Sequence, residues 1–252
     1  RRQRQMCIRD SLNMKKIIYI VLIFLIFNAL GQVDQVYVVT TDNLNVRSGP
    51  GTKYGIVTQL KKGQEVVVTE IYNSSWYKVD VGFNEAYVFS KLITNDPTWK
   101  KLNLSNGSDP YCKNITPRVD AEMDNYLKVN VGNNTDVVIK LMRISNYSEL
   151  CVRIAYVRSN DSFEIKNIPE GKYYLKMAYG RDWRQKNVAG RCYGKFMRSP
   201  LYKKGDQVLD FNLQQNADGY SIPSFELSLD VVASDFDDDF ETNGISEEEF
   251  NN

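Results

Sequence analysis

Short runs of alternating apolar and polar residues, separated by turn residues every ~8–12 positions, constrain this chain more than any other feature. The run Leu44-Asn45-Val46-Arg47 is typical: its two apolar residues would share one face of a strand and its polar residues the other. A Gly-Pro-Gly loop follows at once, because glycine and proline together favour a tight turn. The pattern predicts an all-β protein.

The first 31 residues have the composition of an export signal. Met14-Lys15-Lys16 precedes an apolar run, and Ala29 and Gly31 are small residues at the positions expected before a cleavage site. The apolar segment 17–31 has 15 residues, fewer than the ~20 needed to span a bilayer, so we predict a cleaved signal peptide at 14–31. An uncleaved anchor stays open.

Residues 1–13 precede a complete signal peptide that has its own methionine, and we interpret them as a non-native leader. The predicted location is therefore secreted or periplasmic, in the cell envelope. Contact with the membrane is expected only through the signal segment, if it is uncleaved.

The segment 35–94 is predicted to form a small barrel. Ile56, Val57 and Leu60 are expected to return to its core after a long loop at 48–55. The remaining strands are expected at 36–40, 44–47, 65–72, 76–81 and 86–89.

This segment resembles bacterial SH3-like domains. The resemblance rests on the run 44–51, Tyr54, Leu60-Lys61-Lys62-Gly63, Trp76-Tyr77-Lys78-Val79 and Tyr87-Val88, while Ala86 stands where the family usually has glycine. It implies a small binding module, and peptidoglycan or its peptide as the leading ligand class.

Strand alternation predicts the ligand-binding residues of the barrel. Trp76 and Tyr87 are expected to point away from the core, and exposed aromatic rings offer a large contact area at low entropic cost. Tyr54 is expected to complete the groove, and Asn45 and Arg47 to donate hydrogen bonds. The alternatives are that Trp76 only covers the open end of the barrel, and that Asn45 and Arg47 brace the long loop.

The segment 95–125 is rich in Asn, Ser, Gly and Pro and is predicted to be a linker. The segment 126–232 is predicted to be an antiparallel β-sandwich, with strands at 126–131, 137–142, 150–157, 162–168, 172–179, 208–213 and 225–231. Its stretch 163–175, with a Pro-Glu-Gly turn before a Tyr-rich strand, resembles the carboxypeptidase-regulatory, transthyretin-like family.

The segment 180–186 is predicted to be a loop. Its residues Arg181, Trp183 and Arg184 form a possible second contact site for a sugar, an anionic polymer or a protein. The alternative, which we favour, is that Trp183 folds back to cap the core.

Beyond the signal segment, the cysteines are Cys112, Cys151 and Cys192. One disulfide is expected in an oxidising compartment, and Cys112–Cys192 is the favoured pair because both residues lie in loop-like stretches. The other two pairings and three free thiols remain open.

The segment 233–252 carries eight acidic residues and no basic one, and it is predicted to be a disordered tail. Asp235, Asp237 and Asp239 have calcium-loop spacing, but Phe240 stands where a glycine is required, so no metal site is predicted. The formal net charge of +1 gives no footprint for nucleic acid.

The 252 residues contain no histidine, which excludes imidazole-based triads and most zinc sites. We therefore expect an exported binding protein with no catalytic residues and no cofactor, whose partner is peptidoglycan or an envelope protein. The alternative is an envelope interaction or assembly factor that acts through the sandwich. A carboxylate-based hydrolase is a third, weaker hypothesis, because no pair of acids forms a known motif.

Overall fold

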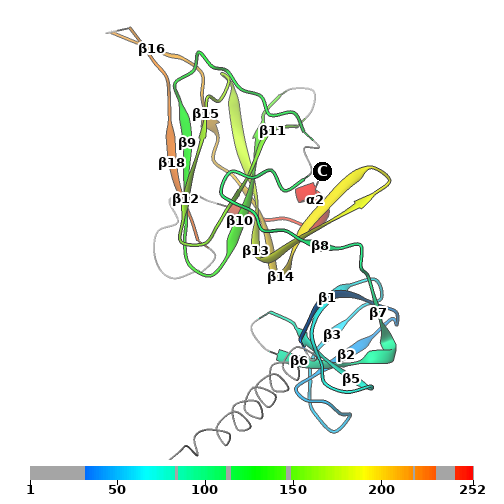
Figure 1. Ribbon diagram of the computed structural model, residues 1–252. Coiled ribbons are helices and arrows are strands. Elements are labelled where there is room, and N and C mark those ends of the chain that lie inside the picture. Colours follow the sequence, from blue (N-terminus) through cyan, green and yellow to red (C-terminus); the bar gives the residue numbers. More distant parts are fainter. Residues whose placement is uncertain are drawn as a thin grey trace, which may run out of the picture. The chain divides into compact units, whose positions relative to one another are not determined.

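The chain folds into two compact units, whose boundary falls between Asp96 and Pro97. The computed structural model (Figure 1) describes residues 32–82, 85–111, 115–145, 149–217, 219–230 and 242–251. The predicted leader and signal peptide lie outside these residues. In the part of the chain that is described, no helix has the length and apolar character needed to cross a membrane.

The first unit is a small barrel built from one antiparallel sheet with the strand order β3-β2-β6-β5-β4-β1-β7. Its elements are β1 (Gln32–Val39), β2 (Leu44–Arg47), β3 (Ile56–Leu60), β4 (Glu65–Ile71), β5 (Trp76–Asp80), β6 (Glu85–Phe89), the 3-10 helix η1 (Ser90–Leu92) and β7 (Ile93–Asn95).

Strand alternation determines which side chains fill the barrel, as predicted. Leu44 and Val46 of β2 are fully buried, whereas Asn45 and Arg47 point to the other face. In β5, Val79 is buried and Tyr77 packs against the same core. The core is completed by Val39, Val66, Val68, Ala86, Val88 and Ile93.

The prediction for β3 was wrong in part. Ile56 is 52% exposed and Val57 44% exposed, and only Leu60 packs against the barrel core. The reason is topological: β3 is the last strand of the sheet, paired only with β2, so most of its side chains have no second layer to pack against.

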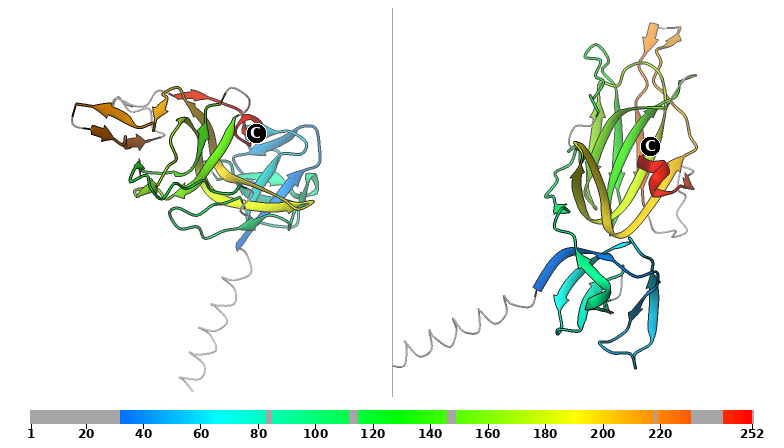
Figure 2. Two further views of the ribbon diagram at one scale, coloured as in Figure 1. Left: turned by 90° about the horizontal axis from the view of Figure 1, so that it is seen from above. Right: turned by 90° about the vertical axis from the view of Figure 1, so that its right-hand side faces the viewer.

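The second unit is a β-sandwich, in which one larger sheet has the order β11-β10-β13-β14-β19 and a smaller one the order β12-β9-β18 (Figure 1, Figure 2). The strands of the larger sheet are β10 (Asp136–Arg143), β11 (Leu150–Val157), β13 (Lys172–Val188), β14 (Arg191–Gly205) and β19 (Thr242–Gly244), and the short strands β8 (Lys100–Lys101) and β15 (Leu209–Asp210) also pair with β13. The smaller sheet has β9 (Tyr126–Val131), β12 (Ser162–Lys166) and β18 (Phe225–Leu229).

The remaining elements are the hairpin of β16 (Gln214–Asn216) and β17 (Gly219–Ser221) and the short helix α2 (Glu247–Asn251). Apolar side chains from the two facing sheets form the main core of this unit, including Leu127, Ile139, Leu175 and Phe211. The pairings are antiparallel apart from β9 with β18, which run parallel. The predicted all-β class and sandwich are thus confirmed, with this one parallel pair as a departure.

The predicted loop at 180–186 was wrong, because these residues belong to β13. This strand continues for 17 residues and pairs with β14 as far as Val188. Trp183 is 3% exposed and Arg184 is also buried, so neither is available as a surface contact; only Arg181 is exposed. Trp183 instead belongs to a second, largely aromatic buried cluster, as in the alternative that the sequence favoured.

The prediction that 95–125 is a linker also needs correction. Trp99 and Tyr111 are buried in the second unit, and Leu102 and Leu104 pack against its aromatic cluster. Each of these apolar residues is isolated among polar neighbours in sequence, but together they cover the face of the larger sheet that does not meet the smaller one.

The acidic tail is ordered where the structure describes it. Residues 242–251 form β19 and α2, and Phe250 is fully buried. Composition misled the prediction here because the buried ring of Phe250 holds the segment on the sheet and one of its acids, Glu247, pairs with Lys195 at 3.5 Å. The segment 231–241, with the calcium-like spacing, lies outside the described residues.

Two cysteines of the second unit differ in state. Cys192 in β14 is disulfide-bonded, whereas Cys151 in β11 carries a free thiol. Burial raises the pKa of the Cys151 thiol to about 11, so the thiol stays protonated at neutral pH. The alternative of three free thiols is therefore wrong. Cys112 lies outside the described residues, and the Cys112–Cys192 pair stays a prediction.

Candidate ligand-binding cleft

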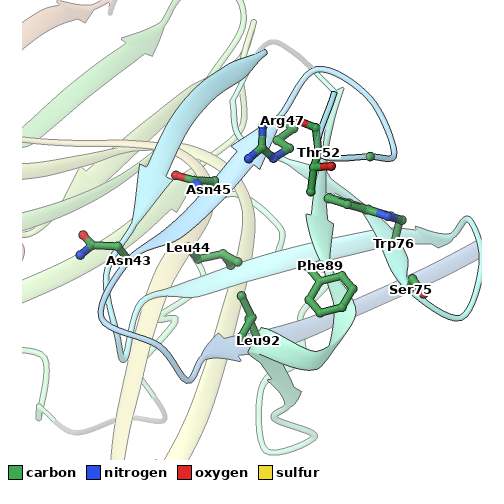
Figure 3. Close-up of a pocket in the computed structure, with 10 residues that line it drawn as sticks. Asn43, Leu44, Asn45, Arg47, Thr52, Ser75, Trp76, Phe89 and Leu92 are labelled. Atoms are coloured by element: carbon green, nitrogen blue, oxygen red, sulfur yellow. Dashed lines mark hydrogen bonds between the residues drawn. The ribbon is translucent and has the colours of Figure 1, made fainter. Parts of the chain in front are cut away.

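A cleft of about 510 Å³ opens on the surface of the barrel (Figure 3). Three parts of the barrel contribute to it: strand β2, the loop that follows it, and the ends of β5 and β6 with η1. Its lining residues are Asn43, Leu44, Asn45, Arg47, Gly51, Thr52, Ser75, Trp76, Phe89 and Leu92.

The structure brings three of the five predicted binding residues together, namely Asn45, Arg47 and Trp76. Tyr54 and Tyr87 do not line the cleft. The ring of Tyr54 lies over Gly49 so closely that a Cβ there would be 2.4 Å from its Cδ1 atom. The ring of Tyr87 contacts that of Tyr72, with centroids 5.6 Å apart. Each tyrosine ring thus packs against another part of the barrel, which accounts for its position outside the cleft.

Trp76 and Phe89 form the aromatic side of the cleft. They lie opposite each other on β5 and β6, with ring centroids 5.7 Å apart and planes inclined at 61°. Phe89 was not predicted as a site residue. It could have been found from the sequence, because residues 87 and 89 share one face of the strand by alternation, and Tyr87 was already predicted to point away from the core.

Trp76 is held by the turn that precedes it. The side-chain carbonyl of Asn73 accepts hydrogen bonds from the backbone amides of Ser75 and Trp76, each at 2.9 Å. The start of η1 also contacts this turn: the Ser90 hydroxyl donates to the Ser74 carbonyl at 2.8 Å and the Ser90 amide donates to the Ser75 carbonyl at 2.9 Å. The backbone that carries the Trp76 indole is thus held by hydrogen bonds with Asn73 and with Ser90.

Arg47 both lines the cleft and braces its loop. Its Nη1 donates to the carbonyl oxygens of Thr52 at 3.2 Å and Tyr54 at 2.7 Å. Asn45 is also engaged, because its side-chain oxygen accepts a hydrogen bond of 2.7 Å from Gln59 on β3. From the sequence we considered that Asn45 and Arg47 brace the long loop. Arg47 makes such contacts with the loop, and Asn45 makes a bracing contact with β3.

The lining combines an apolar side with a polar rim. Leu44, Trp76, Phe89 and Leu92 supply the apolar surface, and amide and hydroxyl groups of Asn43, Asn45, Thr52 and Ser75 surround it. Arg47 is the charged lining residue, and no carboxylate is among the lining residues that the structure describes. Such a site suits a neutral or anionic ligand with one apolar face, and it offers no acid–base pair.

No cluster of three or more His, Cys, Asp or Glu side chains with metal-binding geometry occurs among the described residues of either unit. The chemistry of the cleft lining agrees with this, because amide, hydroxyl and guanidinium groups dominate it.

Replacing Arg47 by methionine should loosen the loop at 48–55. The loss of two hydrogen bonds from the guanidinium is expected to make the amides of Ser48 and Tyr54 exchange about fivefold faster, equivalent to about 1 kcal/mol. Hydrogen exchange followed by mass spectrometry measures this. The Asn45→Ala variant is the control and should leave both amides unchanged; equal exchange in Arg47→Met would contradict the bracing role.

The first unit matches a known protein family. The barrel with its aromatic cleft defines a small binding module, and residues 42–94 match the family model described as the bacterial SH3 domain. This segment is therefore a bacterial SH3 domain, as the sequence motifs indicated.

One curated relative is the Bacillus subtilis protein YrvJ, which carries the name of an N-acetylmuramoyl-L-alanine amidase. It is 35% identical over 81 residues, which make up 32% of this chain and 15% of that protein. The chain thus spans less than a sixth of this relative.

Two solved structures, NlpC1 and NlpC2 from Trichomonas vaginalis, cover 67% of this chain and 46% and 48% of their own lengths. Their sequence identities are 11% and 14%, and both TM-scores are 0.23. A likeness at that TM-score supports no argument about fold or function.

Proposed function

We propose that this chain is a non-catalytic binding protein of the cell envelope, whose SH3 domain recognises peptidoglycan through the cleft beside Trp76. The observation that carries the proposal is the pairing of Trp76 with Phe89 under a rim of amide and hydroxyl groups. Sugar rings and short peptides both present an apolar face edged by hydrogen-bonding groups, which matches this lining.

The relative supports the same ligand class. YrvJ carries the name of an N-acetylmuramoyl-L-alanine amidase, and the bond in that name belongs to peptidoglycan. Export, which the proposal requires, rests on the signal peptide expected at 14–31.

The absence of catalysis in these 252 residues is part of the proposal. The chain has no histidine, so a Cys-His or Ser-His centre cannot be formed from its own residues. The cleft lining lacks a carboxylate pair among the described residues, which argues against acid–base hydrolysis at this position.

The alternative is an envelope interaction or assembly factor that acts through the sandwich, with the segment around Trp183 as one expected contact. Burial of Trp183 and Arg184 removes that exposed contact, but not contacts elsewhere on the sandwich. We favour peptidoglycan binding by the barrel.

A sedimentation assay of the full chain with purified peptidoglycan tests the proposal. We expect Trp76→Ala to reduce the bound fraction at least tenfold at limiting peptidoglycan, a loss of about 1.4 kcal/mol or more, because aromatic anchors dominate such interfaces. Circular dichroism should show an intact fold.

The matched control is Tyr220→Ala, which removes a 72% exposed aromatic ring from the second unit. This variant should bind like the unmodified chain. Failure of the unmodified chain to sediment with peptidoglycan, or equal binding by Trp76→Ala, would lead us to abandon the proposal.

A further inference from the structure

The C-terminal segment 242–251 lies against one face of the second unit like a bound peptide. Its strand β19 extends the larger sheet by pairing with the edge of β14, in the register Lys203 with Gly244 and Gly205 with Thr242. The Ile245 amide continues this ladder by donating to the Tyr202 carbonyl at 3.0 Å. In Figure 1 and in the right-hand view of Figure 2, α2 then lies beside the β13–β14 hairpin.

Phe250 anchors the segment in an aromatic socket. Its side chain is 1% exposed and its ring centroid lies 5.4 Å from that of Tyr202. We use the word socket for the buried cluster to which Phe250 belongs, whose other members are Tyr111, Val138, Tyr156, Ala178, Trp183, Phe196 and Tyr202. An aromatic side chain inserted into a preformed apolar pocket is the usual anchor of a bound peptide.

Two buried lysines bind the backbone of the segment. Lys140 Nζ donates to the carbonyl of Phe250 at 2.7 Å, and Lys176 Nζ donates to the carbonyl of Glu249 at 2.9 Å. These carbonyls belong to the last turn of α2, where cations are favourable because the helix dipole is negative there.

Lys140 is the more informative of the two. Its ammonium group lies 4.5 Å from the ring centroid of Phe250 and 4.9 Å from that of Tyr111, and no carboxylate forms an ion pair with it among the described residues. Burial lowers its pKa to about 8, so the buried charge has a cost that a purely structural strap would avoid. The segment supplies two of the contacts that offset this cost, the carbonyl and the ring of Phe250.

A cavity of about 340 Å³ adjoins Asn251 and is lined by Lys140 and Arg191 together with Tyr111, Met142, Cys151 and Tyr193. Lys140 and Arg191 give this cavity a positively charged lining, which suits an acidic group beside the position of Asn251.

We propose that this face of the second unit is a peptide-binding groove for an acidic peptide with one phenylalanine anchor, and that residues 242–251 occupy it as an intramolecular ligand. The sheet edge recognises the backbone, the socket takes the phenylalanine, and Lys140 and Lys176 bind the carbonyl groups that follow. A partner peptide of the same chemistry competes with the segment. This site is independent of the cleft on the SH3 domain.

The test uses the full chain and a fluorescent peptide with the sequence of residues 242–251. In the Phe250→Ala chain the segment loses its anchor, so the labelled peptide should bind saturably, as measured by fluorescence anisotropy. Binding to the unmodified chain should be at least tenfold weaker because its groove is occupied. A labelled peptide with alanine in place of its phenylalanine should not bind.

Glu248→Ala is the matched control, because Glu248 is exposed on the same helix. This variant should behave like the unmodified chain. A second substitution, Lys140→Met in the Phe250→Ala chain, should weaken peptide binding at least tenfold while leaving the thermal midpoint unchanged or higher, since it removes a buried charge.

Three results would overturn the proposal. They are a folded Phe250→Ala chain that does not bind the peptide, equal binding by all chains, and unfolding of the Phe250→Ala chain. The last would show that the segment is an integral part of the core, whereas a replaceable ligand leaves its groove folded.

Discussion

Replacing Trp183 by alanine is expected to destabilise the second unit by about 3–5 kcal/mol. The indole is 3% exposed and lies between two other rings, with centroid distances of 4.9 Å to Phe196 and 5.5 Å to Tyr111. Gly194 on β14 fits against it so closely that a Cβ at this position would lie 2.4 Å from the Trp183 Cζ2 atom. The neighbouring backbone cannot collapse easily into the space, so the full cavity cost is expected.

Hydrogen exchange by mass spectrometry during denaturant titration measures this effect for each unit separately. In Trp183→Ala, peptides from β13 and β14 should lose protection at lower denaturant, while peptides from the barrel keep theirs. Trp76→Ala is the control, because it should leave the second unit unchanged. If Trp183→Ala cost less than about 1 kcal/mol, the packing role assigned to this residue would be wrong.

A second large loss of stability is expected from Asp182→Ala, again about 3–5 kcal/mol in the second unit. Arg184 donates to the Asp182 Oδ2 atom through Nη2 at 2.9 Å and Nε at 3.1 Å, and both side chains are 3% exposed. Lys101 and Arg198 also lie near this carboxylate, at 3.3 Å and 3.8 Å. Its removal takes two hydrogen bonds and a neutralising charge away from the buried Arg184, and the loss of this charge compensation accounts for most of the cost.

The comparison with Asp182→Asn separates charge from backbone conformation. Asp182 has φ +60°, in the left-handed region that asparagine tolerates well and alanine does not. We expect Asp182→Asn to lose most of the stability that Asp182→Ala loses, because the charge is the larger contribution.

Glu164→Ala serves as the exposed control, since its pair with Lys166 lies on the surface and should contribute at most about 1 kcal/mol. All three variants are compared by thermal and denaturant unfolding. A cost for Asp182→Ala no greater than that for Glu164→Ala would contradict the assignment of a structural ion cluster.

The SH3 domain was the more predictable unit, for a local reason. Its strands are short, each alternates between one buried and one open face, and turn residues mark their ends, so parity alone places Val79 inside and Trp76 outside. Asn45 and Arg47 follow from the same rule. Their second role, bracing a neighbouring strand and the loop, depends on which segments are adjacent in space, which parity does not state.

Tyr54 and Tyr87 were expected in the groove but do not line it. Tyr87 was placed there because strand alternation points it away from the core, and Tyr54 because it lies in the loop after Gly-Pro-Gly. The place of each ring is decided by a partner on another segment, Gly49 for Tyr54 and Tyr72 for Tyr87. An aromatic side chain favours the contact that buries most of its surface area. For these two tyrosines that contact is made with a different segment of the fold, which strand alternation does not reveal.

The second unit was harder to predict because its larger sheet is covered on both faces. One face meets the smaller sheet, and its alternating strands were readable. The other face is covered by residues 99–111 and 242–251, which have the composition of a linker and of an acidic tail. The few apolar residues of these two segments form a buried surface only when the fold brings them together. No short stretch of sequence therefore shows a periodic apolar pattern that would predict it.

The sequence by itself thus determined the all-β class, the strands of the barrel and the outward direction of Trp76, because these depend on alternation between neighbouring residues. Only the tertiary structure decided that Phe89 joins Trp76, that Trp183 lies in a core, and that Phe250 and two buried lysines bring the acidic C-terminus onto the sheet. Those outcomes depend on contacts between segments far apart in the chain, whose energies are set by burial and charge pairing in the assembled fold.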